Sequence, residues 1–210
     1  EAVKKIKLLL DENTLGNILY FDSVRINLGL FHNDVSVIED LAVHDISILD
    51  YLISKNPKSV IANGVAHVKG QKENIAYITL IYDDKFIANI HVNWLSPVKV
   101  RKTLIGCDKK MVVYDDLEPI EKIKIYDKGI KSDLDYKQIN EMRVGYRLGD
   151  MYSPQLKNVE ALNSLLNHFK DCIVNQSTPI TDGLSGLRVV KTIESATKSM
   201  NNNGRPEGLF

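Results

Sequence analysis

The segment Asp40-x-x-x-His44-Asp45 carries the residue types best suited to acid–base chemistry in this chain. It lies in a stretch from about Val35 to Ser54 whose apolar spacing predicts an amphipathic helix. Because residues four apart share a helix face, the Asp40 carboxylate could hydrogen-bond one ring nitrogen of His44 and leave the other free for proton transfer. A second interpretation is also open: apolar residues share this face, so His44 could be a buried core histidine.

Further polar residues with binding chemistry lie on predicted strands and in one loop. An arginine can bind a carboxylate or a pyrophosphate with two hydrogen bonds, so strand arginines and their polar neighbours are candidate substrate contacts. Each of them could instead face solvent or an interface. The candidates are Arg25, Asn27, Lys99 and Arg101 on strands, and Tyr146 and Arg147 before the last helices.

Composition excludes several classes of protein. The 210 residues hold 27 basic and 27 acidic side chains, so net charge gives no argument for nucleic acid or an anionic membrane as partner. No apolar run approaches the roughly 18 residues that span a bilayer. Cys107 and Cys172 lie far apart without metal-type spacing, which argues against a zinc site and indicates a reducing compartment. We therefore expect a cytoplasmic protein with no metal, no nucleic acid and no membrane partner.

Glycine-rich phosphate turns are absent from the sequence. It contains neither Gly-x-Gly-x-x-Gly nor Gly-x-x-x-x-Gly-Lys-Ser/Thr. These turns let the backbone approach the phosphates of a dinucleotide or a nucleoside triphosphate. We expect no cofactor to bind to this chain alone.

The order of elements predicts an α+β fold with a large, mainly antiparallel open sheet and helices packed on one face. A helix at residues 3–10 precedes a long strand at 18–28. Short links between later strands predict a meander, and two amphipathic helices follow it. The strands are expected at 59–68, 75–82, 86–94, 98–106, 110–114 and 122–126. Asp182 or Thr181 could cap the last helix, and residues 201–210 are expected to fray.

The second face of this sheet needs a role of its own. The strand at 86–94 places Asn89, His91 and Asn93 on one side, which is polar but uncharged. Thr79 and Thr103 are expected beside them. Such a face fits a wet but specific partner surface. It predicts a homodimer or tetramer formed through the open face of the sheet.

Three segments together resemble a known family. The Asp40-x-x-x-His44 pair follows a strand with Arg25, and the segment from His91 through Trp-Leu-Ser-Pro97 to Arg101 comes next. The chain then closes with Thr-Asp-Gly183. This order resembles the C-terminal domain of Gfo/Idh/MocA-type oxidoreductases, most of all the branch that acts on nucleotide-linked sugars in surface polysaccharide synthesis.

The resemblance implies a substrate-binding and oligomerisation domain of an NAD(P)-dependent sugar or nucleotide-sugar dehydrogenase. His44 corresponds to the general acid/base and Asp40 to its partner, while NAD or NADP and a catalytic lysine belong to a nucleotide-binding domain that this sequence does not contain. The isolated chain is therefore expected to be inactive. The implied organisation is a linker helix at 1–16, the sheet domain at 17–203 and a tail at 204–210. The alternative is a stand-alone, non-enzymatic binding or assembly module derived from that domain.

Overall fold

The computed structural model describes residues 1–29, 34–83, 85–130, 146–157 and 159–209. Eight strands form one open sheet in the order β10-β7-β6-β5-β1-β4-β3-β2. Every neighbouring pair but β1–β4 is antiparallel, so the predicted fold class is confirmed. The strands are β1 (Ile18–Leu28), β2 (Ser59–Val65), β3 (Ile75–Ile81), β4 (Ile87–Asn93), β5 (Leu95–Cys107), β6 (Met111–Asp115), β7 (Ile123–Tyr126) and β10 (Met151–Tyr152). Two short strands, β8 (Gly129–Ile130) and β9 (Tyr146–Arg147), pair with each other.

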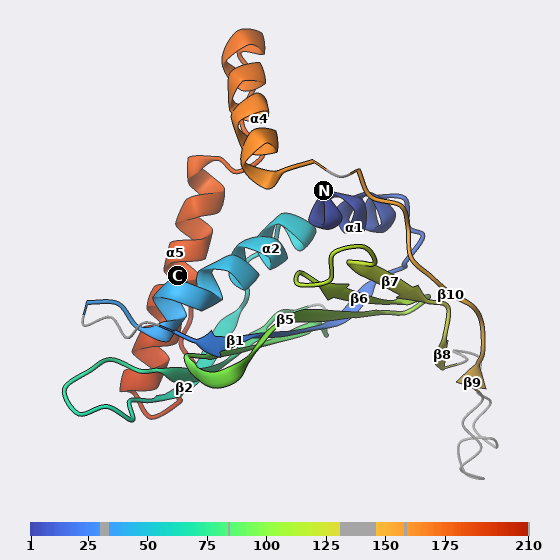
Figure 1. Cartoon of the computed structure of the whole chain (residues 1–210). Coiled ribbons are helices and arrows are strands. Elements are labelled where there is room, and N and C mark those ends of the chain that lie inside the picture. The colour runs from blue at the N-terminus through green and yellow to red at the C-terminus, as the bar shows by residue number, and fades with distance from the viewer. Residues whose placement is uncertain (30–33, 84, 131–145, 158, 210) are drawn as a thin grey trace.

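Helices cover one face of the sheet. In Figure 1, α1, α2 and α5 lie over this face, while α4 stands away from the sheet. Among the described residues, no helix is both long enough and apolar enough to cross a membrane. The helices are α1 (Ala2–Asp11), α2 (Val43–Ile53), α4 (Ala161–Asn175) and α5 (Gly183–Asn201), and the π-helical turn η1 (Ile38–Ala42) runs directly into α2.

The centre of the sheet differs from the predicted meander. Strand β1 lies between β4 and β5, parallel to the first and antiparallel to the second. The link from β4 to β5 therefore passes over the end of β1 at Trp94, whose carbonyl accepts a hydrogen bond from Gly29 N–H at 3.0 Å. Short links indicated neighbouring strands, but a link one residue long can still step across the end of a third strand.

Strand alternation divides the sheet into a core face and an open face. On the core face, large apolar side chains such as Phe21, Ile90 and Ile105 are buried beneath the helices. On the open face, Thr79 Oγ1 donates to Asn89 at 2.9 Å, and the Asn89 amide donates to Asp22 at 3.1 Å.

The open face also holds a stacked aromatic pair. The rings of Tyr77 and His91 lie 4.3 Å apart and nearly parallel. The register corrects the expected position of Thr103: it pairs with Ser23 and is buried on the core face, because Asp22 pairs instead with Leu104.

Both ends of the chain pack onto the fold. The predicted helix at the start of the chain is present as α1, and its Ile6 and Leu9 are buried. The predicted cap of α5 is confirmed for Asp182, whose carboxylate accepts a hydrogen bond from Ser185 N–H at 2.8 Å. The expectation of a frayed tail is wrong, because Glu207 pairs with Val60 of β2 through two backbone hydrogen bonds.

Candidate active site

The turn that carries Asp40 is wider than an α-helical turn. Residues Ile38–Ala42 form the π-helical turn η1, and Val43 begins the regular helix α2. Ser36 and Glu39 support its start, since Ser36 N–H donates to the Glu39 carboxylate at 2.6 Å and Glu39 N–H approaches the Ser36 hydroxyl at 3.4 Å. This reciprocal arrangement is a capping box. Single π turns within helices are frequent at functional sites because they redirect side chains.

Asp40 has a partner that sequence spacing did not indicate. Its carboxylate accepts a hydrogen bond from the indole Nε1 of Trp94 at 3.0 Å. Trp94 is almost fully buried at the corner between β4 and β5. In the described part of the chain no hydrogen bond joins Asp40 to His44, and their link is electrostatic. Trp94 therefore fixes the Asp40 carboxylate against the sheet.

His44 lies on an exposed part of α2, close to charged side chains. Burial of part of the imidazole lowers its pKa, and the positive charges of Arg25 and Arg101 lower it further. The carboxylates of Asp45 and Asp40 act in the opposite direction. The net effect is a pKa below the usual value of about 6.5, so the ring is neutral at pH 7 and can accept a proton. Its exposure argues against the interpretation as a core histidine.

Arg25 and Asp45, the residue after His44, form a buried ion pair. Arg25 Nε and Nη2 donate to the two carboxylate oxygens of Asp45 at 2.7 and 3.2 Å. Burial opposes the charge on Arg25, but the hydrogen bond and the charge of Asp45 outweigh it and raise its pKa. Two parallel hydrogen bonds to a buried carboxylate hold a guanidinium in one orientation. The pair therefore ties α2 to β1 at the residue next to His44.

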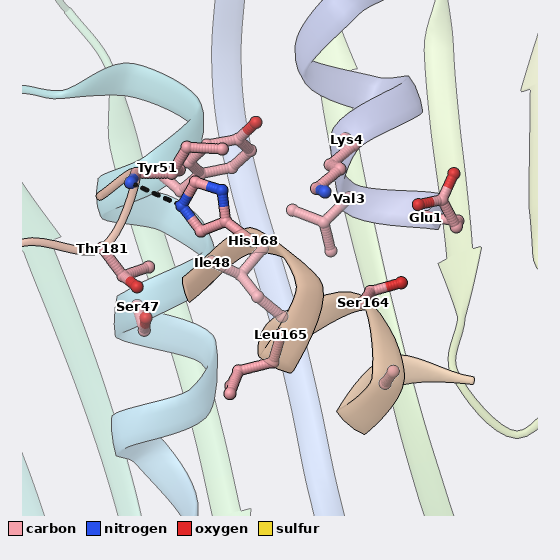
Figure 2. Close-up of a pocket in the computed structure, with 12 residues that line it drawn as sticks. Glu1, Val3, Lys4, Ser47, Ile48, Tyr51, Ser164, Leu165, His168 and Thr181 are labelled. Atoms are coloured by element: carbon pink, nitrogen blue, oxygen red, sulfur yellow. Dashed lines mark hydrogen bonds between the residues drawn. The ribbon is translucent and has the colours of Figure 1, made fainter. Parts of the chain in front are cut away.

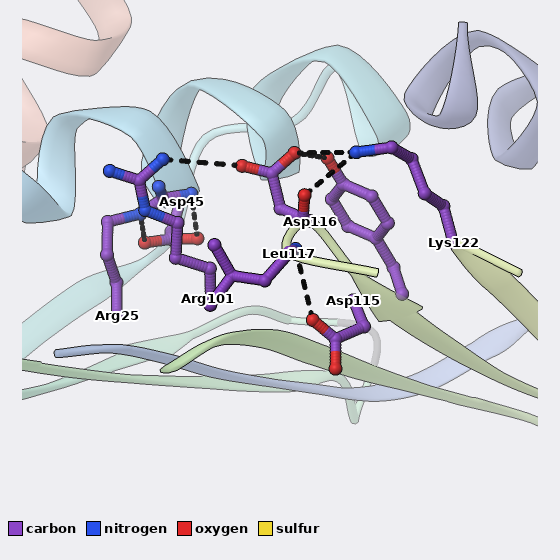
Figure 3. Close-up of polar contacts among 8 residues, drawn as sticks. Arg25, Asp45, Arg101, Asp115, Asp116, Leu117 and Lys122 are labelled. Atoms are coloured by element: carbon purple, nitrogen blue, oxygen red, sulfur yellow. Dashed lines mark hydrogen bonds and ion pairs between the residues drawn. The ribbon is translucent and has the colours of Figure 1, made fainter. Parts of the chain in front are cut away.

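A second arginine faces the same space. Arg101 of β5 pairs directly with Arg25 of β1, so both side chains lie on the helix-covered face. Figure 3 shows Arg101 reaching toward Asp116, with Nη1 3.6 Å from the carboxylate oxygen. The Tyr114 hydroxyl donates to the same carboxylate at 2.9 Å, and Lys122 Nζ donates to the Asp116 carbonyl at 2.8 Å. These contacts join the β6–β7 connection to the site.

The structure therefore brings some predicted residues together and leaves others apart. His44, Arg25 and Arg101 share one region, since both arginines act on the His44 pKa. Asn27 lies two residues beyond Arg25 in β1 and is partly buried, while Lys99 near the start of β5 is exposed. The side chains of Tyr146 and Arg147 lie outside the described part of the structure.

Sequence reasoning missed several members of this region. Asp45 was visible in the motif beside His44 but had no assigned role. Trp94, Asp116 and Lys122 carried no signal in the sequence that placed them in this region. Their contribution depends on strand register and on the turn after β6, neither of which local sequence specifies.

A separate cavity of about 340 Å³ lies between α1, α2 and α4. As Figure 2 shows, Val3, Ile48 and Leu165 line it together with His168. Nε2 of His168 already accepts a hydrogen bond from the backbone N–H of Ile180 at 3.1 Å. The cavity is mainly apolar, which does not favour acid–base chemistry there.

The site does not supply the elements that hold a dinucleotide. Dinucleotide sites use a glycine-rich turn between a strand and a helix of a parallel sheet. The sheet described here is built from antiparallel pairs apart from β1 and β4, and the sequence has no such turn. Among the described residues, no group of three or more His, Cys, Asp or Glu side chains could hold a metal ion.

Comparison with protein families gives one match to this sequence. The profile of the GFO/IDH/MocA C-terminal domain matches residues 3–113, just over half of the chain. No curated protein matches the sequence.

Several solved structures share the fold at low sequence identity. UDP-N-acetylglucosamine 3-dehydrogenase GnnA from Acidithiobacillus ferrooxidans has a TM-score of 0.75 at 19% identity, covering 97% of this chain and 61% of that chain. Aldose-aldose oxidoreductase from Caulobacter crescentus, complexed with glycerol, has a TM-score of 0.75 at 16% identity, covering 99% of this chain and 60% of that chain. An oxidoreductase from Agrobacterium radiobacter, in complex with NAD+, L-tartaric acid and magnesium, has a TM-score of 0.72 at 14% identity. The match covers 99% of this chain and 61% of that chain. The present chain thus spans about three-fifths of the length of these structures.

Proposed function

Because this chain belongs to the GFO/IDH/MocA C-terminal domain family, we propose that it is the substrate-binding and oligomerisation domain of an NAD(P)-dependent oxidoreductase. The proposed substrate is a sugar or nucleotide sugar that is oxidised or reduced at a CH–OH group. His44 is the proposed general acid/base, and Asp40 is its supporting residue. The activity requires a nucleotide-binding domain in addition to the residues described here, so we propose that this chain is inactive alone.

The position of His44 is the observation that carries this proposal. The imidazole is exposed on α2, near enough to Arg25 and Asp45 for their charges to act on it, and its pKa is lowered. A general base must be reachable by the substrate and neutral at the working pH, and His44 meets both conditions. A histidine retained only for packing would be buried.

The chemistry assigned to His44 is proton transfer. Oxidation of a carbinol requires a base to take the hydroxyl proton while the carbon loses hydride. His44 would accept that proton at a ring nitrogen, and in the reverse reaction it would return it. Asp40 would favour the protonated imidazole, because its negative charge raises the His44 pKa. Its hydrogen bond with Trp94 would keep the carboxylate in place.

The nicotinamide cofactor would bind elsewhere in the complete oxidoreductase. The described residues do not fit a dinucleotide, as argued above, so we assign none of them to NAD or NADP. When bound, the cofactor supplies the hydride acceptor or donor. Calorimetry on this chain with NADH and NADPH should show no saturable heat at submillimolar concentration.

The names of two similar structures support a sugar substrate. One is a UDP-N-acetylglucosamine 3-dehydrogenase and another an aldose-aldose oxidoreductase. We propose a place in surface polysaccharide synthesis in the cytoplasm. The further candidate substrate contacts remain Asn27 and Lys99 on strands and Tyr146 and Arg147 after them.

The test is substitution of His44 in the complete oxidoreductase that joins this domain to a nucleotide-binding domain. His44→Gln should lower turnover about a hundredfold or more, the usual scale for a positioned acid/base. His67→Gln, at an exposed site near β2, is the matched control and should leave turnover unchanged. Circular dichroism should show both variants folded. A folded His44→Gln enzyme with normal turnover would contradict the assignment.

A further inference from the structure

Two arginines of the candidate site face each other across neighbouring strands. Arg25 and Arg101 are a direct antiparallel pair. Side chains in such pairs have Cβ atoms about 5 Å apart, and like charges placed there destabilise the sheet. Each guanidinium therefore needs a nearby anion. The structure provides that anion for Arg25 and only partly for Arg101.

Arg25 is fully engaged. It shares two hydrogen bonds with Asp45, and the exposed fractions of the two side chains are 8% and 2%. A substrate group could displace Asp45 only by leaving a buried carboxylate without its partner, which is strongly unfavourable. Arg25 therefore has a structural role beneath the site.

Arg101 is only loosely engaged. Its Nη1 lies 3.6 Å from the Asp116 carboxylate, which is longer than a hydrogen bond, and its Nε is buried without a hydrogen-bond partner among the described residues. The Asp116 carboxylate also accepts from the Tyr114 hydroxyl and lies 3.8 Å from Lys122 Nζ. One carboxylate thus serves two cations and a hydroxyl.

The charges of this group do not balance. In these ion pairs the cationic side chains of Arg25, Arg101 and Lys122 meet two carboxylates, those of Asp45 and Asp116. The third carboxylate of the site, that of Asp40, is hydrogen-bonded to Trp94. The Arg101 side chain is one-third exposed, so an incoming ligand can reach it. A guanidinium with unused donors binds a carboxylate or a phosphate in preference to a neutral hydroxyl group.

We propose that Arg101 binds an anionic group of the substrate, a carboxylate or a phosphate, beside His44. This inference rests on the proposed function and narrows its substrate class to sugars that carry such a group. Arg25 does not contact the ligand. It ties α2 to β1 through Asp45, while Asp116, which accepts a hydrogen bond from Tyr114, lies beside Arg101.

The experiment is a binding titration of the 210-residue chain by calorimetry and NMR. The probes are glucuronate, which carries a carboxylate, glucose 1-phosphate, which carries a phosphate, and neutral glucose. At least one anionic probe should saturate the chain and shift the Arg101 Nε–H resonance, and glucose should do neither. Arg101→Met should weaken that binding by about tenfold or more, the scale of a lost charged hydrogen bond.

Lys102→Met is the matched control. Lys102 follows Arg101 in β5, points to the opposite face and is paired with Asp115 at 3.2 Å. Its loss removes the same charge from the chain and should leave binding unchanged. Equal weakening in both variants would reveal non-specific attraction and overturn the proposal, as would the failure of both anionic probes to bind.

The result is separable from the proposed function. His44→Gln should retain anion binding, because the anion contacts Arg101. Anion binding together with normal turnover of the His44 variant would leave the subsite standing and remove the acid/base assignment. If the His44 variant loses turnover but neither anionic probe binds the unmodified chain, the acid/base assignment stands and the anion subsite is removed.

Discussion

The indole of Trp94 donates a hydrogen bond to the carboxylate of Asp40 at 3.0 Å, although the two residues are 54 positions apart in the sequence. Trp94 lies where the chain steps across the end of β1, and Asp40 lies in the π-helical turn above it. The same contact therefore joins the helix of the candidate site to the centre of the sheet.

This contact predicts a specific energetic coupling. Trp94→Phe removes the donor and leaves a partly buried carboxylate without its partner, at a cost of about 1–3 kcal/mol in the free energy of unfolding. In an Asp40→Ala background, the same substitution should cost about 1 kcal/mol less, because only the packing loss remains. Urea unfolding followed by circular dichroism measures all four proteins. Equal costs in the two backgrounds would show that the hydrogen bond contributes nothing.

The buried Arg25–Asp45 pair should be far more sensitive than a comparable pair nearer the surface. Arg25→Met leaves the buried Asp45 charge uncompensated and should lower the free energy of unfolding by about 3–5 kcal/mol. Arg188 makes a similar two-bond contact with Asp50 at 2.6 and 2.8 Å, but its side chain is one-third exposed. Arg188→Met should therefore cost only about 1 kcal/mol. Denaturant unfolding of the unmodified chain and of both variants measures these two losses of stability.

A rescue variant tests the cause of this loss. In Arg25→Met/Asp45→Leu both charges are gone, so much of the lost stability should return. A double variant as unstable as Arg25→Met alone would assign the loss to packing and not to the unpaired charge.

The pKa of His44 should respond to its arginine neighbours. Burial and the charges of Arg25 and Arg101 lower it, so Arg101→Met should raise it. The pKa of His91 on the open face is lowered by burial alone and should stay unchanged. NMR titration of the ring protons reads both histidines in one sample. An unchanged His44 pKa in the variant would mean that Arg101 exerts no field there.

The same shifts predict how stability depends on pH. Both histidines bind fewer protons in the folded chain than in the unfolded chain between their lowered pKa values and about 6.5. The free energy of unfolding should therefore decrease as pH falls through that window. Well above pH 7, these two residues should contribute nothing to its dependence on pH. Thermal unfolding measured between pH 5 and pH 8 checks this direction.

Assembly through the open face of the sheet remains our proposal. The hydrogen-bonded residues Thr79, Asn89 and Asp22 lie on this face, as does the Tyr77–His91 stack. We expect sedimentation to give at least twice the chain mass of 23.7 kDa. Asn89→Arg should yield a monomer, because it places a charge in the middle of the face. Leu166→Arg, on the exposed apolar side of α4, is the control and should keep the oligomer. Loss of the oligomer only in the Leu166 variant would move the interface to α4.

Local sequence was sufficient for the elements and for part of the site. Strand alternation identified the eleven-residue strand β1, and helical spacing identified α2 with Asp40 and His44. The capping role of Asp182 at the start of α5 was also predictable from the sequence. These features depend on contacts within a few residues, and periodicity reports them directly.

The tertiary structure alone decided which side chains meet. Arg25 faces Arg101 only because β1 inserts between β4 and β5, and Asp40 meets Trp94 only because the chain crosses the end of β1. Alternation states which face a side chain takes, but not which strand lies beside it. That choice depends on the packing of the whole sheet beneath its helices, so the charge balance around His44 could not be read from the sequence.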